Sequence, residues 1–258
     1  METDSGPVAV TPNQAIIFYR SVLDKDYKFV RVLLAVSVSL VFLAFLFSFS
    51  DWYFYTTRSM SGAVGSGTYS WDAWDLLDKE SGKFGTLEEI AAQYGGSPEG
   101  LSDCAWMFTV SSIAGMVLGT AGVVCQPDFR CCGTPEETGL KMNEELQKHY
   151  LKFAAVMVIT TAIALAGLAL AHGWEVAGDM SLYDSLTRTG SYMTEGAGLM
   201  VSIVFGAAAL IIAVYALIVT VRHREPAAQR VRNASALVYF PKKPKAQAIS
   251  GSDRSLWK

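Results

Sequence analysis

The sequence predicts an all-α membrane protein: a four-transmembrane-helix bundle that carries a small, partly β extracellular domain. Of its 258 residues, 51% are hydrophobic and only 17% are charged, and the mean hydropathy is +0.28. The apolar residues are concentrated in separate runs of about twenty, the length that crosses roughly 30 Å of hydrocarbon as an α-helix. A soluble two-domain enzyme is therefore excluded.

Four apolar runs define the predicted transmembrane helices, and the segments between them alternate between the two sides of a membrane. The helices are expected at residues 30–50, 105–125, 153–172 and 197–221. The remaining segments are residues 1–29, 51–104, 126–152, 173–196 and 222–258. Because the number of spans is even, both termini are expected on one side.

The distribution of lysine and arginine predicts which side that is. Both terminal segments and the 126–152 link are rich in these residues, whereas segments 51–104 and 173–196 together contain only Arg58, Lys79, Lys83 and Arg188, against thirteen carboxylates. Cytoplasmic flanks retain positive charge during insertion. We therefore expect a plasma-membrane protein with cytoplasmic termini, a large outer loop (51–104), a small outer loop (173–196) and a basic cytoplasmic tail (222–258).

The N-terminal segment has no features of a cleaved signal peptide, because it begins with acidic residues and its apolar run starts late. Residues 11–27 fit a short interfacial helix, with Thr11 as N-cap, Pro12 in the first turn and Gln14 closing a capping box. A frayed tail that leads into the membrane is the alternative.

Chemistry inside a membrane requires ionisable groups, and the four predicted spans contain none in their cores. His172 and Glu195 stand only at the outer ends of spans. The sequence has no metal-ligand spacing, no nucleophile with a matching base and no phosphate-binding glycine loop. We expect no catalytic residue, no cofactor and no metal site, so the protein is not expected to be an enzyme.

Small residues recur at a spacing of four in three of the spans, which places them on one helix face. Such faces let helix backbones approach closely in a membrane. They meet either the other helices of the same chain or another chain. The predicted helix-packing residues are Gly115, Gly119, Ala162, Ala166, Gly198, Ser202 and Gly206.

The large outer loop opens with DWYFYTT, whose aromatic and β-branched content favours a strand. Trp52 also suits an interfacial aromatic belt. Trp71, Asp72, Trp74 and Asp75 form either an exposed partner-binding patch or a core for the loop itself. The nearby acidic residues lack the ligand spacing of a calcium loop.

Thr86 and Glu89 have the spacing of a capping box, which predicts the start of a short helix in the same loop. Thr134 and the two glutamates after it predict the start of another helix, which extends the third span over residues 136–152.

The cytoplasmic link and tail carry residues suited to lipid contact. Three cysteines stand close to the membrane on the reducing side, where palmitoylation and unmodified thiols are the two alternatives: Cys125, Cys131 and Cys132. Clustered cations in the tail favour anionic lipid by about 1 kcal/mol for each charge near the surface. The predicted contacts are Arg222, Arg224, Arg230, Arg232, Lys242, Lys243 and Lys245.

The topology resembles the claudin superfamily, which includes the peripheral myelin proteins and the calcium-channel gamma subunits. Two stretches carry the resemblance: GTAGVVCQPDFRCC at 119–132 and GLMVSIVFGAAALIIAVYALIVTVRHRE at 198–225. The superfamily's outer-loop Gly-Leu-Trp and disulfide-bonded cysteine pair have no counterpart, since Cys104 is the only cysteine on the predicted outer side. The resemblance implies a claudin-like bundle and a role in adhesion or barrier formation, or as an accessory subunit.

The sequence thus leads us to expect a non-enzymatic subunit whose partners are the lipid bilayer and other membrane proteins or further copies of itself, without nucleic acid. The alternative is a pore-forming channel or transporter subunit that assembles as an oligomer. Its path would be lined by hydroxyl groups of the spans, namely Ser37, Ser39, Ser111, Ser112, Thr160 and Thr161.

Overall fold

The computed structural model describes residues 8–57, 68–93, 96–130, 133–174 and 191–241. Four of its helices are long and apolar enough to cross a membrane: α1 (Pro12–Phe47), α4 (Glu99–Val124), α5 (Pro135–His172) and α7 (Ala197–Arg222). The protein is therefore an integral membrane protein of the multi-pass class, with four predicted spans.

Shorter elements complete the described chain. The helices are α2 (Ala73–Leu77), α3 (Gly82–Gln93) and α8 (Arg224–Ser235). The strands are β1 (Val8–Ala9), β2 (Tyr53–Thr57), β3 (Thr68–Trp71), β4 (Ser191–Glu195) and β5 (Val238–Tyr239). The chain divides into two compact units, and α1 and α5 contribute residues to both.

The smaller unit, here called the terminal unit, combines three distant segments: the described residues up to 26, residues 128–145 and the described residues from 224 onward. Inside it, Tyr19 and Leu23 are fully buried. Gly139 packs so closely that a Cβ there would lie 2.6 Å from Val231 and 2.8 Å from the Tyr19 ring. The first and last strands pair in parallel, with Val8 opposite Val238.

Capping boxes start the two longest helices. The Thr11 hydroxyl accepts from the Gln14 backbone N–H while the Gln14 side chain accepts from the Thr11 N–H at 2.8 Å. Thr134 and Glu137 repeat this arrangement at the start of α5. The capping box predicted at Thr11 is confirmed, but residues 12–27 are a continuous part of α1 and not a separate interfacial helix.

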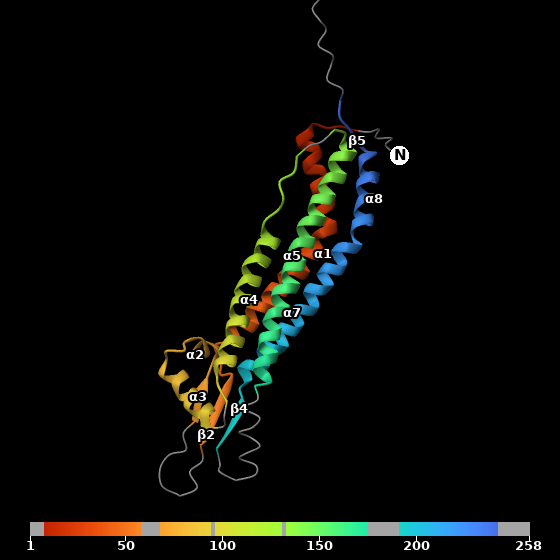
Figure 1. Ribbon diagram of the computed structural model, residues 1–258. Coiled ribbons are helices and arrows are strands. Elements are labelled where there is room, and N and C mark those ends of the chain that lie inside the picture. Colours follow the sequence, from red (N-terminus) through yellow and green to blue (C-terminus); the bar gives the residue numbers. More distant parts are fainter. Residues whose placement is uncertain (1–7, 58–67, 94–95, 131–132, 175–190, 242–258) are drawn as a thin grey trace, which may run out of the picture. The chain divides into compact units, whose positions relative to one another are not determined.

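The larger unit, here called the bundle unit, contains the apolar parts of α1, α4, α5 and α7, which run side by side in Figure 1. Two hydroxyls tie α1 to α7 in opposite directions. Ser37 Oγ donates to the Ala209 carbonyl and Ser202 Oγ donates to the Ala44 carbonyl, both at 3.0 Å. Each bond satisfies a buried hydroxyl across a helix interface.

A three-stranded antiparallel sheet in the order β3-β2-β4 lies at one end of these helices, together with α2 and α3 (Figure 1). We call this part the sheet domain. Its core is aromatic and apolar: Trp52, Tyr53, Trp71, Leu76, Leu87, Leu101 and Phe108 are all at most 1% exposed. Trp52 packs on Phe108 of α4 and is fully buried, so it does not belong to an interfacial belt.

Alternation along β2 explains how the sheet reaches this core. Tyr53 and Tyr55 are buried, whereas Phe54 and Thr56 between them are half-buried, as expected for a strand with one covered face. Helix α3 starts at Gly82, because Ser81 caps it by accepting from the Phe84 N–H. The predicted start at Thr86 is wrong, since that hydroxyl bonds back to the Gly82 carbonyl inside the helix.

Candidate functional site

The sheet domain is joined to the ends of three of the long helices by hydrogen bonds. The Tyr53 hydroxyl donates to the Ala171 carbonyl at the end of α5. The Ala73 N–H donates to the Ser48 carbonyl after α1 at 3.1 Å, and the Gly196 N–H before α7 donates to the Trp52 carbonyl at 2.7 Å. These contacts hold the domain at a defined position on the bundle.

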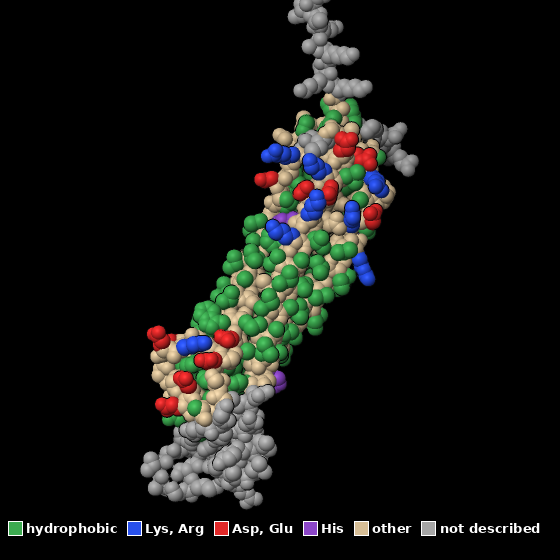
Figure 2. Space-filling view, in the orientation of Figure 1, with side chains coloured by type: hydrophobic (Ala, Val, Ile, Leu, Met, Phe, Trp, Pro, Cys, Tyr) green, Lys and Arg blue, Asp and Glu red, His purple; other side chains and the backbone are tan. Residues whose placement is uncertain are grey.

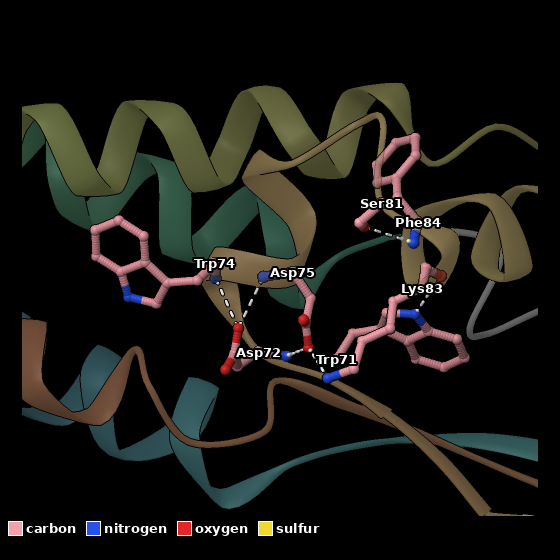
Figure 3. A network of polar contacts seen from close by, with 7 residues as sticks. All are labelled: Trp71, Asp72, Trp74, Asp75, Ser81, Lys83 and Phe84. Carbon is pink, nitrogen blue, oxygen red and sulfur yellow. Dashed lines mark hydrogen bonds and ion pairs between the residues drawn. The ribbon is translucent and has the colours of Figure 1, made fainter.

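Three of the four predicted patch residues serve the architecture of the sheet domain (Figure 3). Asp72 caps α2 by accepting from the N–H groups of Trp74 and Asp75 at 2.8 Å, and Asp75 completes the capping box. Trp71 is 1% exposed and its indole donates to the Lys83 carbonyl at 2.8 Å, so its ring belongs to the core and not to an exposed patch.

Trp74 occupies a different environment from Trp71. Its ring stacks on Phe49 at 5.1 Å and meets the edge of Phe45 at 5.9 Å, where α1 ends. Phe49 is itself 55% exposed. The Trp74 indole N–H is buried and has no hydrogen-bond partner among the described residues. This aromatic group therefore lies beside the end of α1, which is one of the four candidate spans.

A close ion pair joins the start of α3 to α2. Lys83 Nζ lies 2.8 Å from Asp75 Oδ2, and this hydrogen bond raises the pKa of Lys83. Burial raises the pKa of Asp72, although the backbone N–H groups that it accepts act in the opposite direction. In the described part of the chain, no group of three His, Cys, Asp or Glu side chains is placed to hold a metal ion.

The predicted packing glycines of α4 face other helices of the same chain. A Cβ at Gly115 would lie 3.0 Å from Thr160 Oγ1, and one at Gly119 would lie 2.5 Å from both Met157 Sδ and Val38 Cγ2. Sequence reasoning missed Gly122, which continues this face against Phe153. The spacing of three between Gly119 and Gly122 is the signal that would have found it.

Helix α5 uses a different residue from the two that were predicted. Ala162 and Ala166 are exposed in the single chain, so they do not pack inside the bundle. The close approach is made by Gly167, where a Cβ would lie 2.8 Å from the Cys104 carbonyl oxygen of α4. Gly167 is a direct neighbour of Ala166 in sequence and points about 100° away from it around the helix.

The predicted packing residues of α7 are all buried in the bundle, but they differ in how closely the neighbouring atoms approach them. A Cβ added at Gly198 would lie 2.5 Å from the Ser50 carbonyl oxygen, and the Ser202 hydroxyl donates to the Ala44 carbonyl. Gly206 would meet only Leu165 and Leu168, both at an ordinary 3.6 Å.

Most hydroxyls proposed for a pore are engaged within the bundle. Ser37 bonds across to α7, while Ser39, Thr160 and Thr161 donate to carbonyls of their own helices, those of Ala35, Val156 and Met157. Ser111 is half-buried. Three buried hydroxyls of α4 have no partner among the described residues: Ser102, Thr109 and Ser112. Sequence reasoning included only the last of these.

The predicted lipid-contact residues have different environments in the structure. Arg222 and Arg224, around the junction of α7 and α8, and Arg232 are exposed. Arg230 forms an ion pair with Asp26, whose side chain is 3% exposed, so it serves the terminal unit. Cys125 is exposed at the end of α4. Cys131, Cys132, Lys242, Lys243 and Lys245 lie outside the described residues.

Figure 2 shows a band of apolar side chains over the long helices and a group of acidic side chains on the sheet domain. No protein-family model, curated protein or solved structure matches the chain.

Proposed function

We propose that the protein is a non-enzymatic subunit of a larger membrane complex, acting in adhesion, in barrier formation or as an accessory chain, on a claudin-like architecture. The supporting observation is the sheet domain, whose hydrogen bonds to α5, to the end of α1 and to the start of α7 hold it on the bundle. Its position offers a partner a preorganised surface beside the membrane.

The spans favour a structural role over a chemical one. Between residues 32 and 50, and throughout 105–125, 153–171 and 197–221, the sequence contains no Asp, Glu, Lys, Arg or His. Proton relays and coupled transport depend on such groups. Helix packing through Gly115, Gly119 and Gly167 instead produces a closely packed bundle.

The direct experiment is purification of the full chain in a mild detergent, with identification and stoichiometry of the proteins that accompany it. A larger membrane protein at a fixed ratio supports the accessory role, and trans association between vesicles that carry the chain supports adhesion. A chain that purifies alone and does not associate between vesicles contradicts the proposal.

A pore-forming subunit is the second candidate, and it is favoured by the hydroxyls of Ser102, Thr109 and Ser112, which have no partner in the part of the chain that the structure describes. Such groups accept water where a path is open. Conductance of the reconstituted protein in planar bilayers, abolished by Thr109→Val and Ser112→Ala together, would support a pore. A ring-shaped oligomer of this chain alone would also support a pore.

We further propose that both termini face the cytoplasm, in the plasma membrane. Asn233-Ala-Ser235 is the only glycosylation sequon in the sequence, and Asn233 lies exposed on α8. In a secretory-pathway host it should remain unmodified, whereas a sequon introduced near Ser66 should receive a glycan. A glycan on Asn233 would contradict this topology.

A further inference from the structure

A groove of about 370 Å³ runs along the edge of the sheet domain. One wall is β3, through Thr68, Tyr69, Ser70 and Trp71, and the other is the start of α3, through Gly82, Lys83 and Thr86. We propose that this groove binds an extended segment of a partner protein that bears lysine or arginine and adds to the sheet beside β3. The inference rests on the proposed function as a subunit with protein partners.

Strand β3 is suited to accept a further strand. Among the described strands, in the order β3-β2-β4, it pairs with β2 on one side only. Alternate residues of an edge strand direct their backbone N–H and C=O groups away from the sheet, where an extended peptide can bond to them. A groove between an edge strand and a helix is one of the recurring geometries for peptide recognition by strand addition.

The two walls of the groove are held in place before any partner arrives. The Trp71 indole joins them by donating to the Lys83 carbonyl, and its ring is buried beneath. Ser81 caps the first turn of α3. A Cβ built on Gly82 would meet nothing within 4 Å, so space is open beside the start of the helix. Binding therefore requires little ordering of this site.

Charge selects the partner. The described residues between Asp51 and Asp103 include nine carboxylates but only two cations, Lys79 and Lys83. Lys83 is paired with Asp75, and Lys79 lies 3.9 Å from Asp103. Glu89 stands exposed two turns beyond Gly82, on the same face of α3 as the groove. A cationic segment complements this surface, whereas a second copy of the same acidic domain is repelled.

The test uses the full chain in nanodiscs of uncharged lipid and a fluorescein-labelled, end-capped peptide, Lys-Val-Thr-Lys-Val-Thr-Lys, followed by fluorescence anisotropy. At Gly82 an added Cβ meets nothing within 4 Å, so Gly82→Leu should place its side chain in the groove and weaken binding at least about tenfold. Gly100→Leu is the matched control, because its Cβ also meets nothing within 4 Å and it lies at the start of α4, away from the groove. Gly100→Leu should bind the peptide with the same affinity as the unmodified chain.

Two further peptides separate the contribution of strand pairing from the contribution of charge. N-methylation of alternate backbone nitrogens keeps the charge but removes strand pairing, and replacement of lysine by glutamate keeps pairing but reverses the charge. Both should bind at least about tenfold more weakly. The proposal is overturned if the parent peptide does not bind, if Gly82→Leu binds as well as Gly100→Leu, or if either altered peptide binds equally.

The same variants distinguish this site from the wider proposed function. If a protein partner co-purifies equally with Gly82→Leu and with the unmodified chain, the groove proposal fails while the subunit role stands. If Gly82→Leu loses that partner and Gly100→Leu keeps it, the groove is supported. Loss of self-association in Gly82→Leu alone would overturn the proposal in favour of a second copy as the occupant.

Discussion

The two ends of the α7 packing face differ more than their sequence suggests. Gly198 and Gly206 are both buried glycines, eight residues apart on one side of the helix. A methyl group at Gly198 would meet the backbone oxygens of Ser50 and Asp51 at 2.5 and 2.9 Å. At Gly206 it would meet two leucine methyl groups at 3.6 Å. Regular spacing therefore identifies the face that packs but not how closely each position packs.

The nature of the neighbour matters as much as the distance. Backbone atoms fixed at the junction of α1 and β2 cannot move without disturbing the sheet domain. The side-chain ends around Gly119, such as the thioether of Met157, can rotate away. This comparison ranks the following substitutions, with unfolding followed by tryptophan fluorescence during SDS titration in mixed micelles.

Gly198→Ala should have the largest effect, lowering the free energy of unfolding by about 3 kcal/mol. The added methyl group must displace the Ser50 carbonyl, to which the sheet domain is directly connected. Gly206→Ala is the matched control and should be neutral or slightly stabilising, since alanine favours the helix. Equal effects at the two positions would contradict the comparison.

Gly119→Ala should destabilise by about 2 kcal/mol, because Met157 and Val38 must both shift to admit a methyl group. The compensating variant is Met157→Ala in the same chain, which removes the more flexible of the two side chains at 2.5 Å. The free energies lost in Gly119→Ala and in Met157→Ala are added and compared with the loss in the double variant. If the double variant loses as much as this sum, Met157 is not what excludes the methyl group at Gly119.

Gly206→Leu should cost about 1.5 kcal/mol, because leucine exceeds the space left by Leu165 and Leu168. The loss is expected in the isolated chain, as monomer stability. A stable monomer that no longer retains its partner would instead show that this face is an interface between chains. No change in either property would mean that the face is in contact with lipid.

Ser202→Ala should have the smallest effect, about 1 kcal/mol, because it removes one buried hydrogen bond to the Ala44 carbonyl. Ser39→Ala is a suitable control, since that exposed hydroxyl bonds only within its own helix. A larger loss for Ser39→Ala than for Ser202→Ala would contradict the role assigned to the bonds between α1 and α7.

Local patterns predicted much of the architecture. Four apolar runs correspond to four long helices, the capping box at Thr11 and the helix start at Thr134 are both present, and the aromatic run after Asp51 forms β2. These features depend on neighbours in sequence, such as a hydroxyl and a glutamine three residues apart. They require no knowledge of which helices meet.

Features that depend on distant neighbours were missed or misplaced. Ala162 and Ala166 have the correct spacing, but the close contact with Cys104 selects the face of Gly167. Trp71 and Trp74 look equivalent in sequence. Trp71 ends β3 with its side chain in the core, whereas Trp74 lies in the first turn of α2 and its ring stacks on Phe49. The ion pair between the buried Asp26 and the exposed Arg230 joins segments that are 204 residues apart in sequence.

The pairing of Val8 with Val238 has a consequence for biosynthesis. A ribosome makes β1 well before β5, so β1 lacks its partner among the described strands until Val238 and Tyr239 have been made. The pocket around Tyr19 also needs Gly139 and Val231 before it closes. A chain that stops before Val231 therefore leaves the Tyr19 ring less covered, and one that stops before Val238 leaves β1 without this partner, so both would be targets for chaperones and proteases.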